Sequence, residues 1–225
     1  MQSLSEFIER TLFKALYRGY LWYVEKNRGH KVFQISERII EYPFAIANIR
    51  ELPRGSKIAV LGCHGDLLTT ILPSLGYETH GFDMKPYDLE YENFHFHKID
   101  VREIGLPDNS FDAVIAVSTV EHIGMFDGDK DGDEKALAEA NRILKPGGIL
   151  ILTVPCARQR HEISMYQRTY DPLSLERLLP GLSIEELLFY SRNQRGMWER
   201  IDLTGAQFPS ECVALLKATK IPSKA

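Results

Sequence analysis

The sequence predicts an α/β protein built on a mostly parallel, doubly wound sheet, and two observations carry this prediction. Short apolar runs alternate with helical stretches between residues 57 and 154, as expected when each strand is followed by a helix that crosses back over the sheet. The runs at 111–117 and 149–154 show no regular polar alternation, which is typical of strands buried on both faces of a parallel sheet.

The elements are predicted in the following order. Apolar residues at helical spacing predict a helix from about residue 3 to residue 26, and a second from about 36 to 49 with Ser36 as its N-cap. The segment "LPRGSK" at 52–57 ends this pattern. We therefore expect an N-terminal helical cap over residues 1–52 and a main domain over residues 53–225. In the main domain, strands are predicted at 57–61, 77–82, 94–99, 111–117 and 149–154, and helices from Asp66, at 134–144 and at 172–179. The runs at 182–191 and 211–218 are predicted to pair as an antiparallel edge hairpin.

Composition narrows the class of protein. The 225 residues suit one globular domain with some additional length, and a formal net charge of -4 gives no reason to expect nucleic acid as a partner. No apolar run approaches the ~20 residues that a membrane helix needs, and the N-terminus has no signal-peptide core. Three widely spaced cysteines, Cys63, Cys156 and Cys212, predict no disulfide framework and favour a reducing, cytoplasmic location.

The loop after the first predicted strand, "VLGCHGD" at 60–66, indicates the kind of cofactor. A dinucleotide loop needs three glycines because its pyrophosphate touches bare backbone; here only Gly62 fits that frame, and no GK[ST] sequence follows. Asp83, 21 positions after Gly62, ends the second strand, where an acid accepts hydrogen bonds from a ribose. A ribose acceptor without a pyrophosphate cradle suits S-adenosylmethionine.

A series of motifs then supports this interpretation. Between residues 55 and 155 the chain carries "KIAVLGCHGD", "GFDMK", "KIDV", "LPDNSFD", "STVEHIG" and "RILKPGGILILTVP", in this order. This region resembles the class I S-adenosylmethionine-dependent methyltransferases, most closely the branch that includes the quinone-biosynthesis enzymes. The resemblance implies a Rossmann-like, seven-stranded sheet of order 3-2-1-4-5-7-6 with an antiparallel last strand. It also implies O- or N-methyl transfer from S-adenosylmethionine to a small or medium metabolite.

The resemblance assigns roles to residues of this chain. The loop Gly62, Cys63, His64 and Gly65 would contact the methionine part of the cofactor, Asp83 the ribose, Met84 and Val101 the adenine faces, Asp100 the adenine amine, and Ser118 the methionine side. Three residues depart from the family pattern: Val60 replaces an acid, and His64 and Asp66 replace glycines. Asp66 either helps to hold the methionine ammonium group or caps the next helix, and the capping role is favoured.

His122 is the candidate general base, because it follows the fourth strand at the expected mouth of the pocket and titrates near neutral pH. The alternative is that Glu121 and His122 only shape the loop, since methyl transfer mainly needs an acceptor held in line. We also expect the N-terminal cap to lie over the carboxyl edge of the sheet and close the pocket, as helices of this class often do.

The acceptor is less specified. Arg158, Arg160 and His161 follow the fifth strand and would form a cation cluster near His122, which suits a sugar-like or anionic acceptor. The alternatives are a solvated loop, or an apolar aromatic acceptor held by Tyr166, Tyr170 and Trp198.

No metal site is predicted. The acidic loop at 126–134 begins like a calcium-binding loop, but Ala138 stands where the bidentate Glu is needed. A solvated loop with Asp133 capping the next helix is favoured. His95 and His97 share one face of a strand without a third ligand nearby in the sequence.

Two rival functions remain open at this point. A nicotinamide-dependent oxidoreductase could use a similar sheet, although the missing glycines disfavour it. A non-catalytic cofactor-binding or interaction protein could keep the fold, and the departures at Val60 and His64 are what support it.

Overall fold

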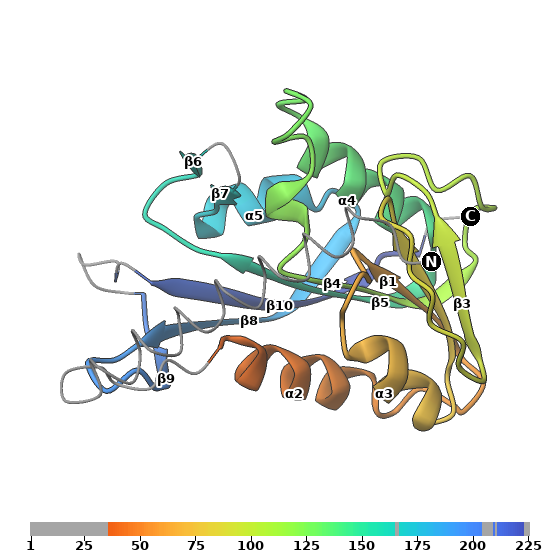
Figure 1. The fold of residues 1–225 in the computed structure, drawn as a ribbon. Helices are drawn as coiled ribbons and strands as arrows, with labels where there is room; N and C mark the ends of the chain where they lie inside the picture. The colour runs from red at the N-terminus through yellow and green to blue at the C-terminus, as the bar shows by residue number, and fades with distance from the viewer. Residues whose placement is uncertain (1–35, 165–166, 204–208, 210, 223–225) are drawn as a thin grey trace, which may run out of the picture. The chain divides into compact units, whose positions relative to one another are not determined.

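The computed structural model describes residues 36–164, 167–203, 209 and 211–222. Their main element is an eight-stranded sheet of order β3-β2-β1-β4-β5-β10-β8-β9 (Figure 1). The strands are β1 (Lys57–Leu61), β2 (Glu78–Asp83), β3 (Phe94–Lys98), β4 (Phe111–Val117), β5 (Leu144–Pro155), β8 (Leu182–Arg192), β9 (Trp198–Ile201) and β10 (Cys212–Lys220). The helices are α2 (Arg38–Ile49), α3 (Leu68–Ser74), α4 (Gly132–Ile143), α5 (Pro172–Leu178) and the 3-10 turn η1 (Val120–His122).

The predicted fold is confirmed, with two additions. Strands β3, β2, β1, β4 and β5 are parallel, and β10 is antiparallel to both β5 and β8. The first seven strands of the sheet thus reproduce the expected order. Strand β9, which pairs with β8 and makes that edge of the sheet, was not predicted. Nor was a separate hairpin of β6 (His161–Ser164) and β7 (Gln167–Thr169). The predicted helix at 3–26 lies outside the described residues.

Two apolar layers hold the sheet between helices. Alternate residues of the central strands point to opposite faces: Ile58 and Val60 pack with α2 and α3, whereas Ala59 and Leu61 pack with α4. Figure 1 shows α2 and α3 on one side of the sheet and α4 and α5 on the other. Both faces of β1 and β4 are therefore buried, which explains why their sequences are nearly continuous apolar runs.

Helix and strand ends differ in detail from the predictions. The N-cap of α3 is Leu67; Asp66, one residue earlier, accepts a hydrogen bond from the Leu68 amide at 2.8 Å, so its carboxylate satisfies a backbone donor at the start of the helix, close to the expected capping role. Asp133 does not cap α4, because Asp131 stands at the N-cap and the Asp133 side chain is buried elsewhere. Strand β5 begins earlier than predicted, at Leu144, so that residues 145–148 belong to it, and its pairing with β4 shifts register there.

The cysteine prediction is wrong. Cys156, directly after β5, forms a disulfide with Cys212, the first residue of β10, although 56 positions separate them. Antiparallel pairing of these strands brings the two Cα atoms to 5.1 Å. Cys63 is buried and has a free thiol. The cysteines therefore no longer argue for a reducing compartment.

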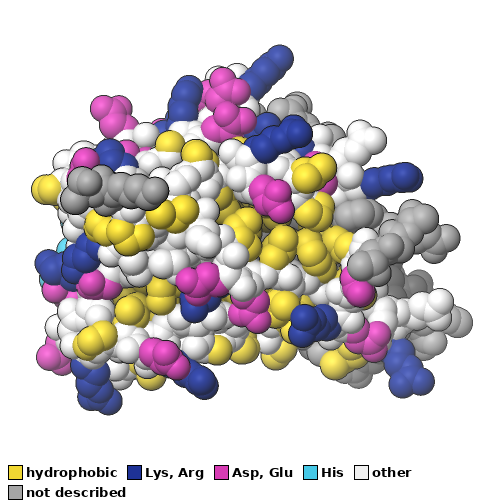
Figure 2. Space-filling view, turned by 180° about the vertical axis from the view of Figure 1, so that it is seen from behind, with side chains coloured by type: hydrophobic (Ala, Val, Ile, Leu, Met, Phe, Trp, Pro, Cys, Tyr) yellow, Lys and Arg dark blue, Asp and Glu magenta, His cyan; other side chains and the backbone are white. Residues whose placement is uncertain are grey.

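The surface gives no single-sign charge patch on the face drawn in Figure 2, where Lys and Arg alternate with Asp and Glu around a central apolar area. Among the described helices, none is both long and apolar enough to cross a membrane.

Candidate functional site

A cavity of about 580 Å³ opens at the carboxyl ends of the parallel strands, where ligands bind in open α/β sheets. We call it the first cavity. It gathers residues that follow β1, β2, β3 and β4, and seven of the predicted site residues line it: Gly62, Asp83, Met84, Asp100, Val101, Ser118 and His122. The order of the strands thus brings together side chains from a 61-residue span of the chain.

Asp83 is fixed in place by backbone donors. Its Oδ2 atom accepts a hydrogen bond from the His64 amide at 3.0 Å, and its Oδ1 atom accepts one from the Lys85 amide at 2.8 Å. Each carboxylate oxygen keeps a further lone pair, so two more donors can bind. The geometry suits the two hydroxyl groups of a ribose.

The contact with Asp83 explains why His64 can replace a glycine. Only its backbone amide points at Asp83, while the imidazole is exposed beside the Tyr87 ring, with the ring centroids 5.5 Å apart. Cys63 is fully buried, and burial raises the pKa of its thiol to about 12. Cys63, His64 and Gly65 do not line the first cavity.

Gly62 is the loop position at which no side chain can be accommodated. Its φ is +68°, and a Cβ atom there would lie 2.4 Å from Cγ2 of Thr119. The Thr119 hydroxyl is held in turn by the carbonyl oxygens of Leu61 and Val117, so the side chain has little freedom to move away.

We therefore expect Gly62→Ala to lower the free energy of unfolding by about 2–4 kcal/mol, from left-handed backbone strain and overpacking together. Gly65→Ala is the matched control, because Gly65 has a φ of +75° but no atom within 4 Å of the added Cβ; it should cost only about 1–2 kcal/mol. Urea denaturation measures both. Equal losses would show that the Thr119 contact carries no cost.

The first cavity is lined by apolar side chains as well as by the charged residues Asp100 and Arg102. Met84, Ile99, Val101, Ile123 and Phe126 supply the apolar walls, and the Met84 and Phe126 side chains are largely exposed. Exposed apolar side chains at the rim of a cavity suit a flat ring. Phe126 was not predicted as a site residue, because it lies in an acidic loop that indicated solvent.

Arg102 ties this acidic loop to the sheet. Its guanidinium binds Asp100 at the end of β3 and reaches Asp127 at 2.6 Å and Asp129 at 2.9 Å. The hydrogen bonds from Arg102 lower the pKa of the Asp100 carboxyl. The loop acids are thus neutralised by a protein cation. In the described part of the chain, they form no cluster that could hold a metal ion.

Ser118 is held in an unusual backbone conformation, with a φ of +42°. Its hydroxyl donates to Oε1 of Glu41 at 2.8 Å, and the Thr153 hydroxyl donates to the same oxygen at 2.7 Å. Arg38 donates to the other oxygen of Glu41. A strained residue that its surroundings hold in place is typical of a binding site.

Glu41 is a further candidate functional residue, and it was not predicted from the sequence. It is fully buried in α2, and the Val60 side chain is buried in the core layer shared with α2. A charged residue among apolar neighbours in "RIIEYPF" was the available signal, since buried carboxylates are rare unless they are paired.

A second cavity, of about 360 Å³, adjoins the first. It is lined by Glu37, Arg38, Ser118, Glu121, His122, Pro155, Cys156, Gln167, Thr169, Arg192, Trp198, Glu211, Cys212 and Val213. Ser118 and His122 line both cavities. The two cavities therefore meet at the end of β4, where the candidate base stands.

Glu121 lies at this junction and is almost completely buried. Its Oε1 atom is 3.8 Å from Nε2 of His122, and its Oε2 atom has no hydrogen-bond partner among the described residues. Burial raises the pKa of its carboxyl to about 8. A carboxyl group that titrates near neutral pH beside a cavity can exchange a proton with a ligand.

The predicted cation cluster is not found. Arg160 forms an ion pair with the buried Asp133 at 2.8 Å and another with Glu134 at 3.2 Å, and it lines neither of the two cavities. Arg158 is exposed on the same loop, and His161 lies in β6. These residues follow β5, as expected, but the loop turns Arg160 toward α4.

Of the two described residues in the aromatic alternative, Trp198 lines the second cavity and Tyr170 does not. Tyr170 is fully buried, and its hydroxyl donates to Asp133 at 2.8 Å. Tyr166 lies outside the described residues. The second cavity instead takes its cations from Arg38 and Arg192; Arg192 stacks on the Trp198 ring at 4.9 Å and pairs with Glu211 at 3.1 Å.

The part of the chain that is similar to known proteins includes the residues of the first cavity. Residues 60–152 match the family model of a methyltransferase domain. This segment contains the carboxyl ends of β1 to β4 that line the first cavity. The matched segment is similar to a methyltransferase domain, and the sheet has the Rossmann-like methyltransferase fold; the quinone-biosynthesis branch is not distinguished. No curated protein matches the sequence.

Solved structures share the fold at low sequence identity. 1,6-Didemethyltoxoflavin-N1-methyltransferase of Burkholderia thailandensis, crystallised with 1,6-didemethyltoxoflavin and S-adenosylhomocysteine, is 14% identical at a TM-score of 0.64, over 99% of this chain and 92% of its own. The N-methyltransferase NodS of Bradyrhizobium japonicum, in complex with S-adenosylhomocysteine, is 12% identical at 0.59, over 82% and 87%.

A third structure with this fold is described by a different reaction. The [4+2]-cyclase SpnF is 15% identical at a TM-score of 0.60, over 85% of each chain. Fold likeness at these identities therefore leaves the reaction to be argued from the site.

Proposed function

We propose that this protein binds S-adenosylmethionine in the first cavity and transfers its methyl group to a small molecule held in the second. The observation that carries the proposal is the meeting of the two cavities at Ser118 and His122. A cofactor on one side and an acceptor on the other would have their reacting ends at the same place. Holding two reactants in line is the main requirement of methyl transfer.

The residues of the first cavity fit S-adenosylmethionine better than a dinucleotide. Asp83 offers acceptor positions for a ribose, and the apolar walls suit adenine. The exposed side chains at His64 and Leu67 occupy positions where a dinucleotide loop needs glycine. S-adenosylmethionine supplies a methyl group on a positively charged sulfur, and it carries no phosphate for such a loop to cradle.

In this proposal Glu41 and Ser118 position the methionine end of the cofactor. The Glu41 carboxylate is 2.8 Å from the Ser118 hydroxyl, and its charge lies on the side of the sheet where Val60 replaces the usual acid. Asp66 is engaged at the start of α3. We infer that Glu41, and not Asp66, supplies the missing negative charge.

Glu121 and His122 are proposed to receive the proton that leaves the acceptor. Methylation of a hydroxyl or amine releases one proton. Burial raises the pKa of the Glu121 carboxyl to about 8, and the ionised fraction of this group, which grows as the pH rises, can accept that proton. The Oε2 atom of Glu121 is buried without a hydrogen-bond partner among the described residues, and Glu121 lines the second cavity. His122 remains the alternative proton acceptor.

The second cavity favours a small, flat acceptor without a strong negative charge. Its two arginines are already paired, Arg38 with Glu41 and Arg192 with Glu211. The Trp198 ring offers a surface for stacking. An O–H or N–H group on a planar ring would satisfy both Glu121 and Trp198. The sugar-like or anionic acceptor loses its main support because Arg160 is engaged by Asp133.

The N-terminal cap over residues 1–52 remains part of the proposal. The first residues of the described helix, Glu37 and Arg38, line the second cavity. We propose that the start of α2 helps to exclude water from the acceptor, and that the acceptor is a small molecule.

The test of the cofactor assignment is Asp83→Ala, measured by calorimetry with S-adenosylmethionine, S-adenosylhomocysteine and NAD. We expect the parent protein to bind the first two and the variant to bind them at least tenfold more weakly, because charge-assisted hydrogen bonds to the ribose are lost. Asp88→Ala, at a nearby exposed acid, should leave the affinity unchanged.

Two outcomes would contradict the proposal in different ways. Binding of NAD alone would favour an oxidoreductase. Binding of S-adenosylmethionine without transfer to any planar hydroxyl or amine acceptor would favour a non-catalytic protein, or one with a different reaction on the same fold.

A further inference from the structure

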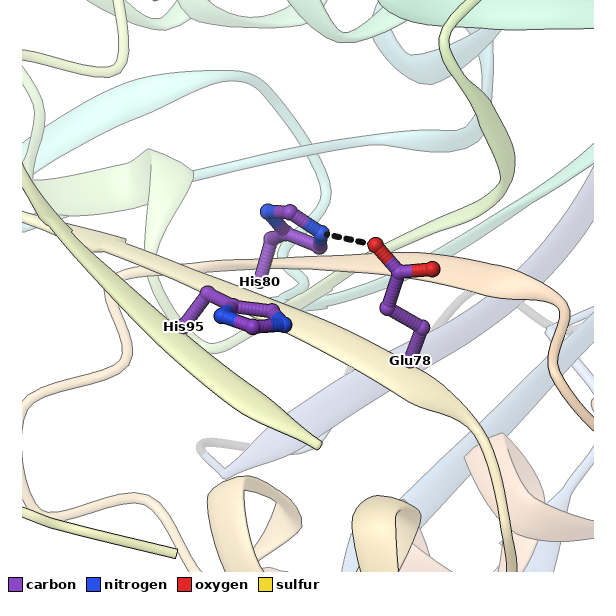
Figure 3. A group of neighbouring side chains, drawn as sticks. All are labelled: Glu78, His80 and His95. Carbon is purple, nitrogen blue, oxygen red and sulfur yellow. Dashed lines mark hydrogen bonds and ion pairs between the residues drawn. The ribbon is translucent and has the colours of Figure 1, made fainter. Parts of the chain in front are cut away.

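A cluster of histidines and one carboxylate lies between β2 and β3, away from the two cavities. Glu78 and His80 come from β2 and His95 from β3, and Figure 3 shows the three side chains on the same side of the two strands. One ligand atom from each can be chosen so that all three lie within 4.8 Å of one another. The register of the sheet pairs His80 directly with His95.

We propose that Glu78, His80 and His95 bind a divalent transition-metal ion of the Zn²⁺ type. Two imidazoles and one carboxylate are a ligand set that Zn²⁺ accepts, with bonds of about 2.0–2.2 Å, and that leaves a fourth position for water. This proposal does not depend on the proposed methyl transfer.

The distances agree with a site that needs little rearrangement. Ligand atoms around a tetrahedral Zn²⁺ lie about 3.4 Å apart, given bonds of about 2.1 Å. Nε2 of His80 and Oε1 of Glu78 are already 3.0 Å apart. The His95 ring is exposed, so it can rotate by the small remaining distance without disturbing the core.

His97 gives His80 the outer partner that metal-bound histidines usually have. Its Nε2 atom is 2.9 Å from Nδ1 of His80, and the two rings stack with their centroids 5.2 Å apart. A proton on Nδ1 of His80, donated to His97, leaves the Nε2 lone pair directed at Glu78. In this tautomer Nε2 of His80 is free to bind a metal ion beside Glu78; in the other tautomer it donates a hydrogen bond to Glu78, and metal binding would release that proton.

One further feature allows a metal ion to enter the cluster. Lys57 is 2.9 Å from Oε1 of Glu78, but its side chain is half exposed. Its ammonium group can therefore move into solvent when a divalent ion takes its place.

The site would join the edge strand β3 to β2. β3 is paired on one side only, and an edge strand is the part of a sheet that opens most easily. A metal ion that binds the native state and not the unfolded chain would raise the melting temperature, and the increase would grow with the logarithm of the free metal concentration above the dissociation constant. Neither the acidic loop nor the first cavity provides such a cross-strand link.

The experiment uses the full, tag-free chain without cofactor. Zn²⁺ binding is measured by calorimetry, and Co²⁺ binding by its visible absorption, which reports the coordination geometry. We expect one ion per chain with micromolar or tighter affinity, and a higher melting temperature with Zn²⁺. His95→Gln and Glu78→Gln should each weaken Zn²⁺ binding at least 100-fold, and His97→Gln by 10–100-fold, the usual effect of an outer partner.

A matched control separates this site from general surface binding. Glu90→Gln removes an exposed carboxylate from the same β2–β3 connection and should leave the Zn²⁺ affinity unchanged. Circular dichroism checks that each variant is folded. If Glu78→Gln does not fold, the test rests on His95→Gln, because the His95 ring is exposed. A dissociation constant weaker than 1 mM for the parent chain, or equal affinity in the parent and His95→Gln, would overturn the proposal.

Discussion

Glu121→Gln is expected to make the protein more stable at pH 9 by on the order of 4 kcal/mol, and to change its stability little at pH 5. Burial raises the pKa of the Glu121 carboxyl from 4.5 to about 8, and every tenfold change in proton affinity corresponds to about 1.4 kcal/mol. Glutamine has the same shape and no charge to bury. The free energy of unfolding, measured by urea denaturation at both pH values, gives the comparison.

The sign follows from proton counting. Between about pH 4.5 and pH 8 the folded protein keeps the Glu121 proton that the unfolded chain has lost. Stability therefore falls as pH rises through this window and levels off above pH 8. The charged groups around Glu121 are Glu37, Arg38 and Glu41 from the α2 segment, His122 beside it, and Tyr170. None of them changes in the variant, so the difference belongs to Glu121.

Glu176→Gln, at an exposed acid of α5, is the control and should shift stability by less than about 0.5 kcal/mol at either pH. The same variants test the proposed chemistry. If Glu121 receives the acceptor proton, Glu121→Gln should lower kcat while the affinity for S-adenosylmethionine is kept. An unchanged kcat would transfer that role to His122, and equal stability at pH 5 and pH 9 in the parent protein would contradict the buried, proton-holding state.

Glu41→Ala is expected to destabilise the protein by about 2–4 kcal/mol, because it removes a buried carboxylate that accepts hydrogen bonds from two hydroxyl groups and from a partly exposed guanidinium. The Glu41 side chain is fully buried and binds Arg38, Ser118 and Thr153 together. Its removal leaves the buried Thr153 hydroxyl and the partly buried Ser118 hydroxyl without their acceptor, and the Arg38 guanidinium without its main charge partner. Urea denaturation at pH 7 measures the loss.

Glu51→Ala, at an exposed acid just after the same helix, should change stability by less than about 0.5 kcal/mol. Glu41→Ala should also weaken cofactor binding, because Ser118, with its φ of +42°, loses the hydrogen bond from its hydroxyl to Glu41. A loss of under about 1 kcal/mol would mean that water replaces the carboxylate at little cost, and the network would then lose its proposed role in positioning Ser118.

Much of the fold follows from the sequence alone. The central strands β1, β4 and β5 were predictable because strands buried on both faces require continuous apolar residues. Asp83, Asp100 and Ser118 were placed at one edge because the carboxyl ends of parallel strands meet there. The hydrogen bond that Asp66 accepts at the start of α3 was predictable from an acid directly before a helical pattern.

The contacts that complete the sites were decided by the tertiary structure. Glu41 meets Ser118 across 77 positions, Cys156 meets Cys212 across 56, and Arg160 meets Asp133 across 27. His95 lies beside Glu78 and His80 only because β3 pairs with β2 in the register that sets His95 opposite His80. Local spacing determines which way a side chain points along its own element. Which side chain it meets depends on strand order, register and the path of the connecting loops, and these are set by the packing of the whole domain.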